Sequence, residues 1–206
     1  MSQSSRTSSW IGRLTNRQQS QPQSPGQPAP AGNTEIQVAG TFLMDLLFGL
    51  GPYRSLVLRS MVKRDIARVN PESWYPMQNL SRTLEEVQTS IGPHILFWVG
   101  RKTAQQLLLR AEAVFESPHD AIAVLDRCYR LSHRIQPAES PNALPVGNWQ
   151  FNRRGAGAAE VLIQSPYPHE WLHGLICGAV RDGDPMVQVQ TTSTQAGQSA
   201  FVLRWD

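Results

Sequence analysis

The segment His169-Glu170-Trp171-Leu172-His173 could do chemistry. It matches the H-E-x-x-H pattern, in which two histidines one helical turn apart bind zinc and the glutamate is the base for the bound water. Such a site needs a third protein ligand. Asp182 and Asp184 follow the same helix too closely to fold back on it, and upstream Glu139 stays open as a ligand. A zinc-dependent hydrolase is therefore an alternative and not the leading interpretation.

The same segment also has the pattern of a packed helix. Apolar residues recur at helical spacing through the stretch 168–181; they are Leu172, Leu175, Ile176, Ala179 and Val180. Gly174 and Gly178, four residues apart, predict a close approach of this helix to a β-sheet. The leading interpretation assigns no metal, with His169, His173 and Cys177 as the alternative metal ligands.

A second alternative is a haem-based gas sensor. The run from Tyr129 to Arg134 resembles the Y-x-S-x-R propionate clamp of haem nitric-oxide sensors. Its serine, Ser132, stands one residue too far from the tyrosine, which on a helix turns the side chain by about 100°. His94 or His119 could be an axial ligand, but neither has a supporting motif.

Two β-hairpins must flank the segment. Residues 148–164 alternate apolar and polar around a glycine-containing turn, and residues 187–205 do so around a second turn. The order is hairpin, helix, hairpin. We expect an α+β fold in which N-terminal helices pack on one face of a four-stranded antiparallel sheet.

The N-terminal helices are predicted from periodicity and from stop signals. Apolar spacing and Gly-Pro or Asn-Pro pairs predict helices over 43–50, 53–69, 80–87 and 95–109. Ser117-Pro118-His119-Asp120 is a strong helix start. The apolar face of that helix is predicted as Ala121, Val124, Leu125, Cys128 and Leu131.

Composition divides the 206 residues into two parts. Residues 1–36 are mostly Ser, Gln, Pro and Gly and are predicted to be a disordered tail, followed by one domain over 37–206. Residues 1–33 carry three arginines and no acidic residue, which equals the net charge of +3 of the whole chain. The domain is thus nearly neutral, which disfavours nucleic-acid binding. No segment approaches the about 20 apolar residues of a membrane span. Two cysteines in apolar surroundings favour reduced thiols and a cytoplasmic protein.

Several motifs in order resemble a known family. They are Trp74-Tyr75-Pro76-Met77, Ile91-Gly92-Pro93-His94, Val99-Gly100-Arg101-Lys102, Asp126-Arg127-Cys128-Tyr129, Ser165-Pro166-Tyr167-Pro168, Gly174-Leu175-Ile176-Cys177-Gly178 and Phe201-Val202-Leu203-Arg204-Trp205. Together they resemble bacterial sensory domains of the 4-vinyl-reductase type, which are similar in fold to the vesicle-tethering TRAPP subunits. The resemblance implies a helix-covered sheet, often dimeric, that binds a small hydrophobic molecule or is a signalling scaffold, without catalysis.

These patterns lead to one main hypothesis. We expect a non-enzymatic, small-molecule-binding sensory or signalling-scaffold domain without a cofactor, which forms a homodimer and contacts a signalling protein. A pocket for a small hydrophobic ligand is expected between sheet and helices. Its predicted lining residues are Tyr129, Trp149, Phe151, Tyr167 and Trp171.

Overall fold

The computed structural model describes most of the chain after the predicted tail. The described residues are 35–64, 66, 68–112, 115–136, 148–181, 186–195 and 197–205. The predicted tail, apart from its last two residues, lies outside them. So do Glu139, Asp182 and Asp184, the three acidic residues considered as zinc ligands.

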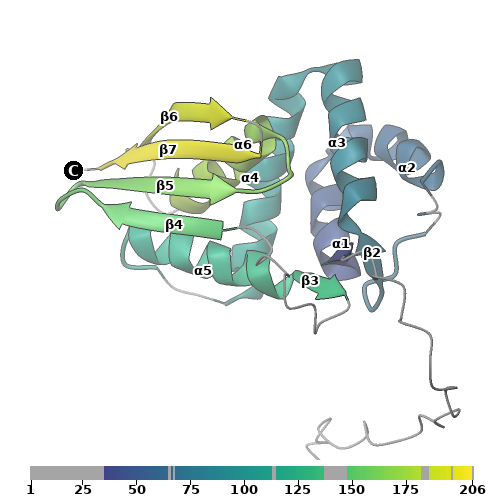
Figure 1. Cartoon of the computed structure of the whole chain (residues 1–206), viewed down its shortest axis with the longest axis horizontal. Helices are drawn as coiled ribbons and strands as arrows, with labels where there is room; N and C mark the ends of the chain where they lie inside the picture. Colours follow the sequence, from purple (N-terminus) through teal and green to yellow (C-terminus); the bar gives the residue numbers. More distant parts are fainter. Residues whose placement is uncertain are drawn as a thin grey trace, which may run out of the picture. The chain divides into compact units, whose positions relative to one another are not determined.

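A four-stranded antiparallel sheet forms from the two predicted hairpins (Figure 1). Its strands, in the spatial order β4-β5-β7-β6, are β4 (Asn148–Arg153), β5 (Ala158–Gln164), β7 (Gln198–Arg204) and β6 (Gln188–Gln195). Helix α6 (His169–Arg181) lies between the hairpins in sequence. The α+β class is therefore confirmed.

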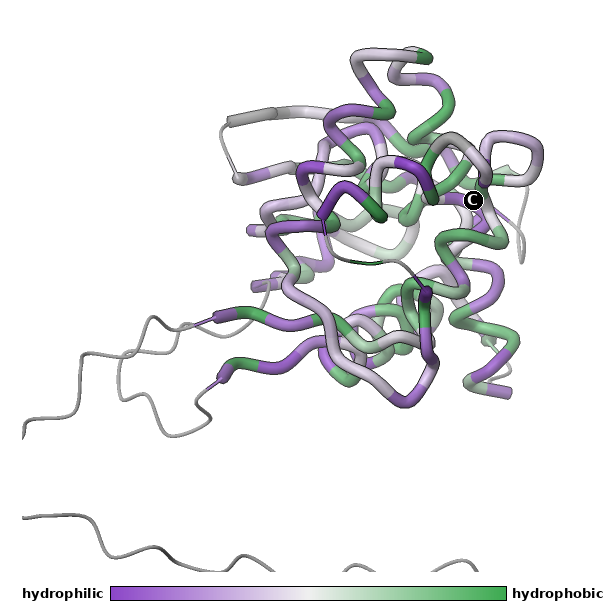
Figure 2. The backbone as a smooth tube through the Cα atoms, turned by 90° about the vertical axis from the view of Figure 1, so that its right-hand side faces the viewer, coloured by the Kyte–Doolittle hydropathy of each residue, from purple (hydrophilic) through white to green (hydrophobic). Residues whose placement is uncertain are grey.

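One face of this sheet is apolar because the side-chain period of a strand is two. Val161 of β5 pairs with Phe201 of β7, and both side chains are fully buried. Helix α6 covers this face through His169, whose ring stacks on that of Phe201 at 5.3 Å. Green and purple bands alternate along the helices and strands in Figure 2, as expected for elements with one buried face.

A second, three-stranded sheet was not predicted from the sequence. It has the order β2-β1-β3 and consists of β2 (Trp74–Pro76), β1 (Glu35–Ala39) and β3 (His133–Gln136). Arg134 of β3 places its guanidinium 4.4 Å from the ring centre of Trp74 and donates to Gln37 at 2.7 Å. Strand β1 pairs with β2 across nearly 40 residues and with β3 across nearly 100, so no local pattern marks these short strands.

The remaining helices precede the hairpins. They are α1 (Gly40–Gly49), the 3₁₀ turn η1 (Gly51–Tyr53), α2 (Arg54–Val62), α3 (Met77–Ile91), α4 (Pro93–Arg110) and α5 (Pro118–Leu131). Ser117 caps α5 as predicted, since its Oγ accepts from the backbone N–H of Asp120 at 3.3 Å. Helix α2 is shorter than predicted, because the chain turns after Val62 and Ile66 N–H bonds back to Met61.

The predicted placement of the N-terminal helices requires correction. Helices α1 and α3 pack mainly on α4 and β1, beside the four-stranded sheet and not on its face (Figure 1). Of the helices before the hairpins, α5 does reach the sheet, where Tyr129 contacts Trp149 of β4, and α6 covers the sheet face at Phe201. The physical reason is that α6 already occupies the apolar face, so that α4 packs on the opposite side of α6.

Glycines set the contact between α4 and α6. A Cβ at Gly174 would collide with the carbonyl oxygen of Phe97, and one at Gly100 would collide with the carbonyl oxygen of Trp171. Gly178 lies equally close to the backbone of Arg101. The prediction that Gly174 and Gly178 approach a sheet was therefore wrong, because they approach a helix. None of the described helices has both the length and the apolarity that a membrane crossing requires.

Candidate functional site

The H-E-x-x-H segment begins α6 and is engaged in packing. His169 Nδ1 lies 2.9 Å from Ser199 Oγ, and its Nε2 lies 3.2 Å from Thr191 Oγ1. Burial lowers the pKa of both His169 and His173, so the neutral rings are favoured. Within the described ranges, no three His, Cys, Asp or Glu side chains are grouped to hold a metal ion. With both nitrogens of His169 hydrogen-bonded, this geometry gives the zinc hydrolase alternative no support.

Four of the five predicted pocket residues come together in the core. Rings of Tyr129 and Trp149 lie 5.4 Å apart, and those of Tyr167 and Trp171 lie 4.7 Å apart. Sequence reasoning missed Phe42 and His133, which pack among them; the His133 and Tyr129 rings stack at 4.2 Å. We call Phe42, Tyr129, His133, Tyr167 and Trp171 the aromatic cluster. Phe151 lies elsewhere, against His119 at 4.3 Å.

The aromatic cluster is filled and internally hydrogen-bonded. Tyr129 Oη lies 3.0 Å from Ser165 Oγ. His133 Nδ1 donates to the carbonyl oxygen of Tyr129 at 2.6 Å, which leaves Nε2 to accept from the Tyr167 hydroxyl at 2.8 Å. Burial lowers the pKa of His133 to about 4 and raises the pKa values of both tyrosines. These side chains are therefore neutral core components that fill the space between them.

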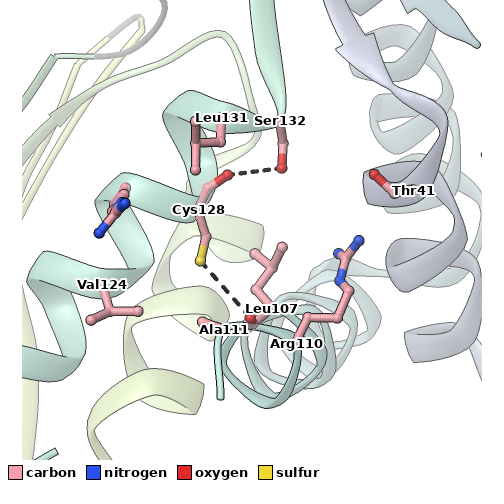
Figure 3. Close-up of a pocket in the computed structure, with 9 residues that line it drawn as sticks. Thr41, Leu107, Arg110, Ala111, Val124, Cys128, Leu131 and Ser132 are labelled. Atoms are coloured by element: carbon pink, nitrogen blue, oxygen red, sulfur yellow. Dashed lines mark hydrogen bonds between the residues drawn. The ribbon is translucent and has the colours of Figure 1, made fainter. Parts of the chain in front are cut away.

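A more open space lies between α1, α4 and α5, and we call it the α1–α4–α5 pocket (Figure 3). Its volume is about 490 Å³, within the range of about 300–1,000 Å³ typical of small-molecule and cofactor sites. It is lined by Thr41, Leu107, Arg110, Ala111, Val124, Arg127, Cys128, Leu131 and Ser132. The pocket thus combines apolar walls with a thiol and two guanidinium groups.

The pocket exists because α5 presents two different faces. Ala121, Leu125 and Tyr129 are buried in the core. Val124, Cys128 and Leu131 recur at a spacing of four and three residues on the neighbouring face, where Leu131 is 71% exposed. The predicted apolar face merged the two sets. The sequence did contain a signal for this second face, because the apolar residues of α5 cover a wider stripe than a single contact with the core requires.

One thiol and two arginines are the ionisable groups that line the pocket. Cys128 Sγ lies 3.8 Å from the carbonyl oxygen of Leu107, and Figure 3 shows it pointing toward α4. Burial raises the pKa of the Cys128 thiol, and Arg110 and Arg127 oppose that rise. Burial also lowers the pKa of Arg110. The arrangement favours a ligand that brings negative charge to the arginines or a metal to the sulfur.

Solved structures similar to this chain share its fold. An Fe(II) unliganded H-NOX protein from K. algicida has a TM-score of 0.60 at 9% identity, over 81% of this chain and 95% of that one. An oxygen-binding H-NOX domain related to soluble guanylate cyclases has a TM-score of 0.55 at 15% identity, over 80% and 92%. A protein described for modulation of haem redox potential by porphyrin distortion has a TM-score of 0.58 at 16% identity, over 81% and 98%. The chain therefore has an H-NOX-like fold.

The similarity of this chain to these solved structures corrects two predictions. The family resemblance to 4-vinyl-reductase-type and TRAPP-like domains was wrong, because the similar solved structures are described as H-NOX or haem proteins. The main functional hypothesis, a small-molecule-binding sensory or scaffold domain of that family, is contradicted for the same reason, and the haem alternative fits the neighbours better. No family model and no curated protein matches the chain.

The histidines do not fit an axial role in a haem site. His94 and His119, the two residues considered from the sequence, are exposed, and His119 borders a recess of only about 210 Å³. His133 and His169 have both ring nitrogens hydrogen-bonded. His173 stacks on Phe97 and Phe201. None of the five histidines lines the α1–α4–α5 pocket.

The proposed propionate clamp does not assemble either. Tyr129 points into the core, Ser132 bonds the carbonyl oxygen of Cys128 at 2.8 Å, and Arg134 covers Trp74 in the small sheet. Of the two cysteines, Cys177 is buried on α6, whereas Cys128 lines the pocket. Of the candidate ligands, Cys128 and no histidine lines the pocket, so a haem held there would be bound through a thiolate, with two arginines beside it.

Proposed function

We propose that this chain is a haem-based sensor domain that binds haem in the α1–α4–α5 pocket, where Cys128 would hold the iron. One observation carries the proposal: among five histidines and two cysteines, Cys128 alone lines a pocket of about 490 Å³ with cationic walls. The likeness in fold to an oxygen-binding H-NOX domain supports it. Cysteine thiolate is an established class of haem ligand.

Cys128 must lose its proton to ligate iron. Burial raises the pKa of its thiol, which disfavours the free thiolate, while Arg110 and Arg127 favour it. Because a metal binds only the thiolate, uptake of the ligand releases a proton and should strengthen as pH rises. On binding iron, the thiol would give up its weak hydrogen bond to the Leu107 carbonyl oxygen at 3.8 Å.

The other pocket residues have separate roles in the proposal. Arg110 and Arg127 would pair with the carboxylates of haem, since guanidinium groups match carboxylate geometry. Leu107, Val124 and Leu131 would provide apolar contact with the macrocycle. When bound, haem would supply an iron atom at which a diatomic gas can bind. We assign no catalytic step to the chain.

Haem titration of the purified chain tests the proposal. We expect one haem per chain, seen as a shifted Soret band with thiolate character, for the wild type and for Cys177→Ala. Cys128→Ala should weaken binding at least tenfold and abolish the thiolate signature, because only this cysteine lines the pocket. Wild type that binds no haem would refute the function. Equal spectra for both variants would exclude Cys128 as the ligand.

The remaining predictions about partners stand as predictions. A homodimer, a signalling protein that reads the domain, the absence of nucleic-acid binding and a cytoplasmic location are each compatible with a sensor of this kind. Size-exclusion chromatography with light scattering, with and without haem, would report the oligomeric state directly.

A further inference from the structure

Arg110 belongs to two sites at once. It is the last residue of α4 and lines the α1–α4–α5 pocket. It also forms an ion pair with Asp45 of α1 through Nη2 and Oδ2. In Figure 3 its side chain extends from α4 toward α1 and Thr41. A single guanidinium therefore connects the pocket to the contact between these two helices.

Asp45 is largely enclosed and is paired with Arg110 by charge. Its side chain is 14% exposed, whereas that of Arg110 is 45% exposed. Thr41, one helical turn before Asp45, lines the same pocket. A carboxylate that enters the pocket therefore approaches Arg110 from its open side and brings a second negative charge near Asp45.

We infer that a carboxylate of the pocket ligand competes with Asp45 for Arg110, so that ligand binding weakens the attachment of α1 to the end of α4. The inference rests on the proposed function, because it takes haem as the carboxylate-bearing ligand. Two like charges that share one guanidinium repel each other, and an enclosed carboxylate that loses its partner is strongly disfavoured. The displaced contact lies between α1 and α4, so occupancy of the pocket changes the packing of α1.

Asp45→Asn tests this competition in the full chain, because it removes the competing charge at nearly constant volume. We expect haem to bind this variant about five- to tenfold more tightly than the wild type. Haem should also speed backbone hydrogen exchange in α1 of the wild type and leave it unchanged in Asp45→Asn. The matched control is Asp126→Asn, which removes an exposed ion pair with Arg130 on α5 and should leave the affinity unchanged.

Two further measurements test whether the carboxylates of haem and the guanidinium of Arg110 are responsible for the effect. Haem dimethyl ester, which lacks the carboxylates, should bind the wild type and Asp45→Asn equally. Arg110→Gln should weaken haem binding and remove the effect of Asp45→Asn in the double variant. Haem binding that is equal or weaker in Asp45→Asn overturns the competition and leaves the proposed function standing. Failure of every variant to bind haem overturns both.

Discussion

Gly174 of α6 lies directly against the backbone carbonyl of Phe97 in α4. No side chain fits between these two residues, since a Cβ at Gly174 would overlap that oxygen. Gly100 and Gly178 continue the same close contact along the two helices. Helix α6 in turn covers the four-stranded sheet through His169 and Phe201. The α4–α6 contact therefore joins the sheet to the N-terminal helices.

Gly174→Ala should destabilise the protein strongly. The added methyl group meets backbone and not a flexible side chain, so the helices must separate. We expect the free energy of unfolding to fall by about 3 kcal/mol, at the upper end for overpacking. Urea denaturation followed by circular dichroism measures it. The exposed α3 residue Gln78 is the control, because Gln78→Ala should change stability by less than about 0.5 kcal/mol. Similar losses for both variants would contradict the close contact.

Local signals in the sequence were enough for much of the fold. Ser117 was recognised as a helix cap because its side chain acts within one turn. The two hairpins were recognised because alternation and turn residues are also local. The small sheet was missed because β1, β2 and β3 are short and pair across distant segments. Helix α4 was not recognised as the partner of Gly174, because a glycine shows that something approaches closely but not what approaches.

The candidate site was harder to predict than the fold. Cys128 and Val124 were assigned to a single buried face of α5, yet the structure turns Tyr129 into the core and leaves Cys128 in the pocket. A difference of one residue is about 100° on a helix, and periodicity cannot decide it when apolar residues cover more than one face. The pairing of Arg110 with Asp45 joins two helices 65 positions apart and leaves no local pattern.

The capping of α5 by Ser117 gives a second prediction. Ser117→Ala removes the acceptor for the backbone N–H of Asp120, which should lower the free energy of unfolding by about 1 kcal/mol. Thermal denaturation would detect this loss. Ser90→Ala, at an exposed position in α3, is the matched control and should be neutral. A neutral Ser117→Ala would show that the cap contributes nothing to α5.

The hydrogen bond between Tyr129 and Ser165 gives a third prediction. Tyr129→Phe keeps the ring in the aromatic cluster and removes the 3.0 Å bond to Ser165 Oγ, so stability should fall by about 1 kcal/mol. A double-mutant cycle with Ser165→Ala should give a coupling energy of about 0.5–1.5 kcal/mol. Tyr53→Phe, at a position that is 39% exposed, should have little effect. Additive effects of the two core changes would exclude the hydrogen bond.

His133 gives the last prediction, which concerns pH. Burial lowers the pKa of its imidazole from 6.5 to about 4 in the folded protein. Between these values the unfolded chain binds a proton that the folded chain does not, so stability falls as pH drops from about 6.5 toward 4. At pH 4.5 this single group should account for a loss of about 2–3 kcal/mol relative to pH 7.

His133→Gln isolates that contribution, because glutamine can hydrogen-bond but does not titrate. The variant should be less stable than the wild type at pH 7, since the ring fits between Tyr129 and Phe42. Its stability should nevertheless fall less on acidification, by the same 2–3 kcal/mol, when urea denaturation is compared at pH 7 and pH 4.5. Burial also lowers the pKa values of His169 and His173, and hydrogen bonds to Ser60 and Arg64 lower the pKa of Glu86. These three groups destabilise the wild type and the variant in acid by the same amount. Their effects therefore cancel in the difference. If His133→Gln loses as much stability in acid as the wild type, a neutral buried imidazole at this position is excluded.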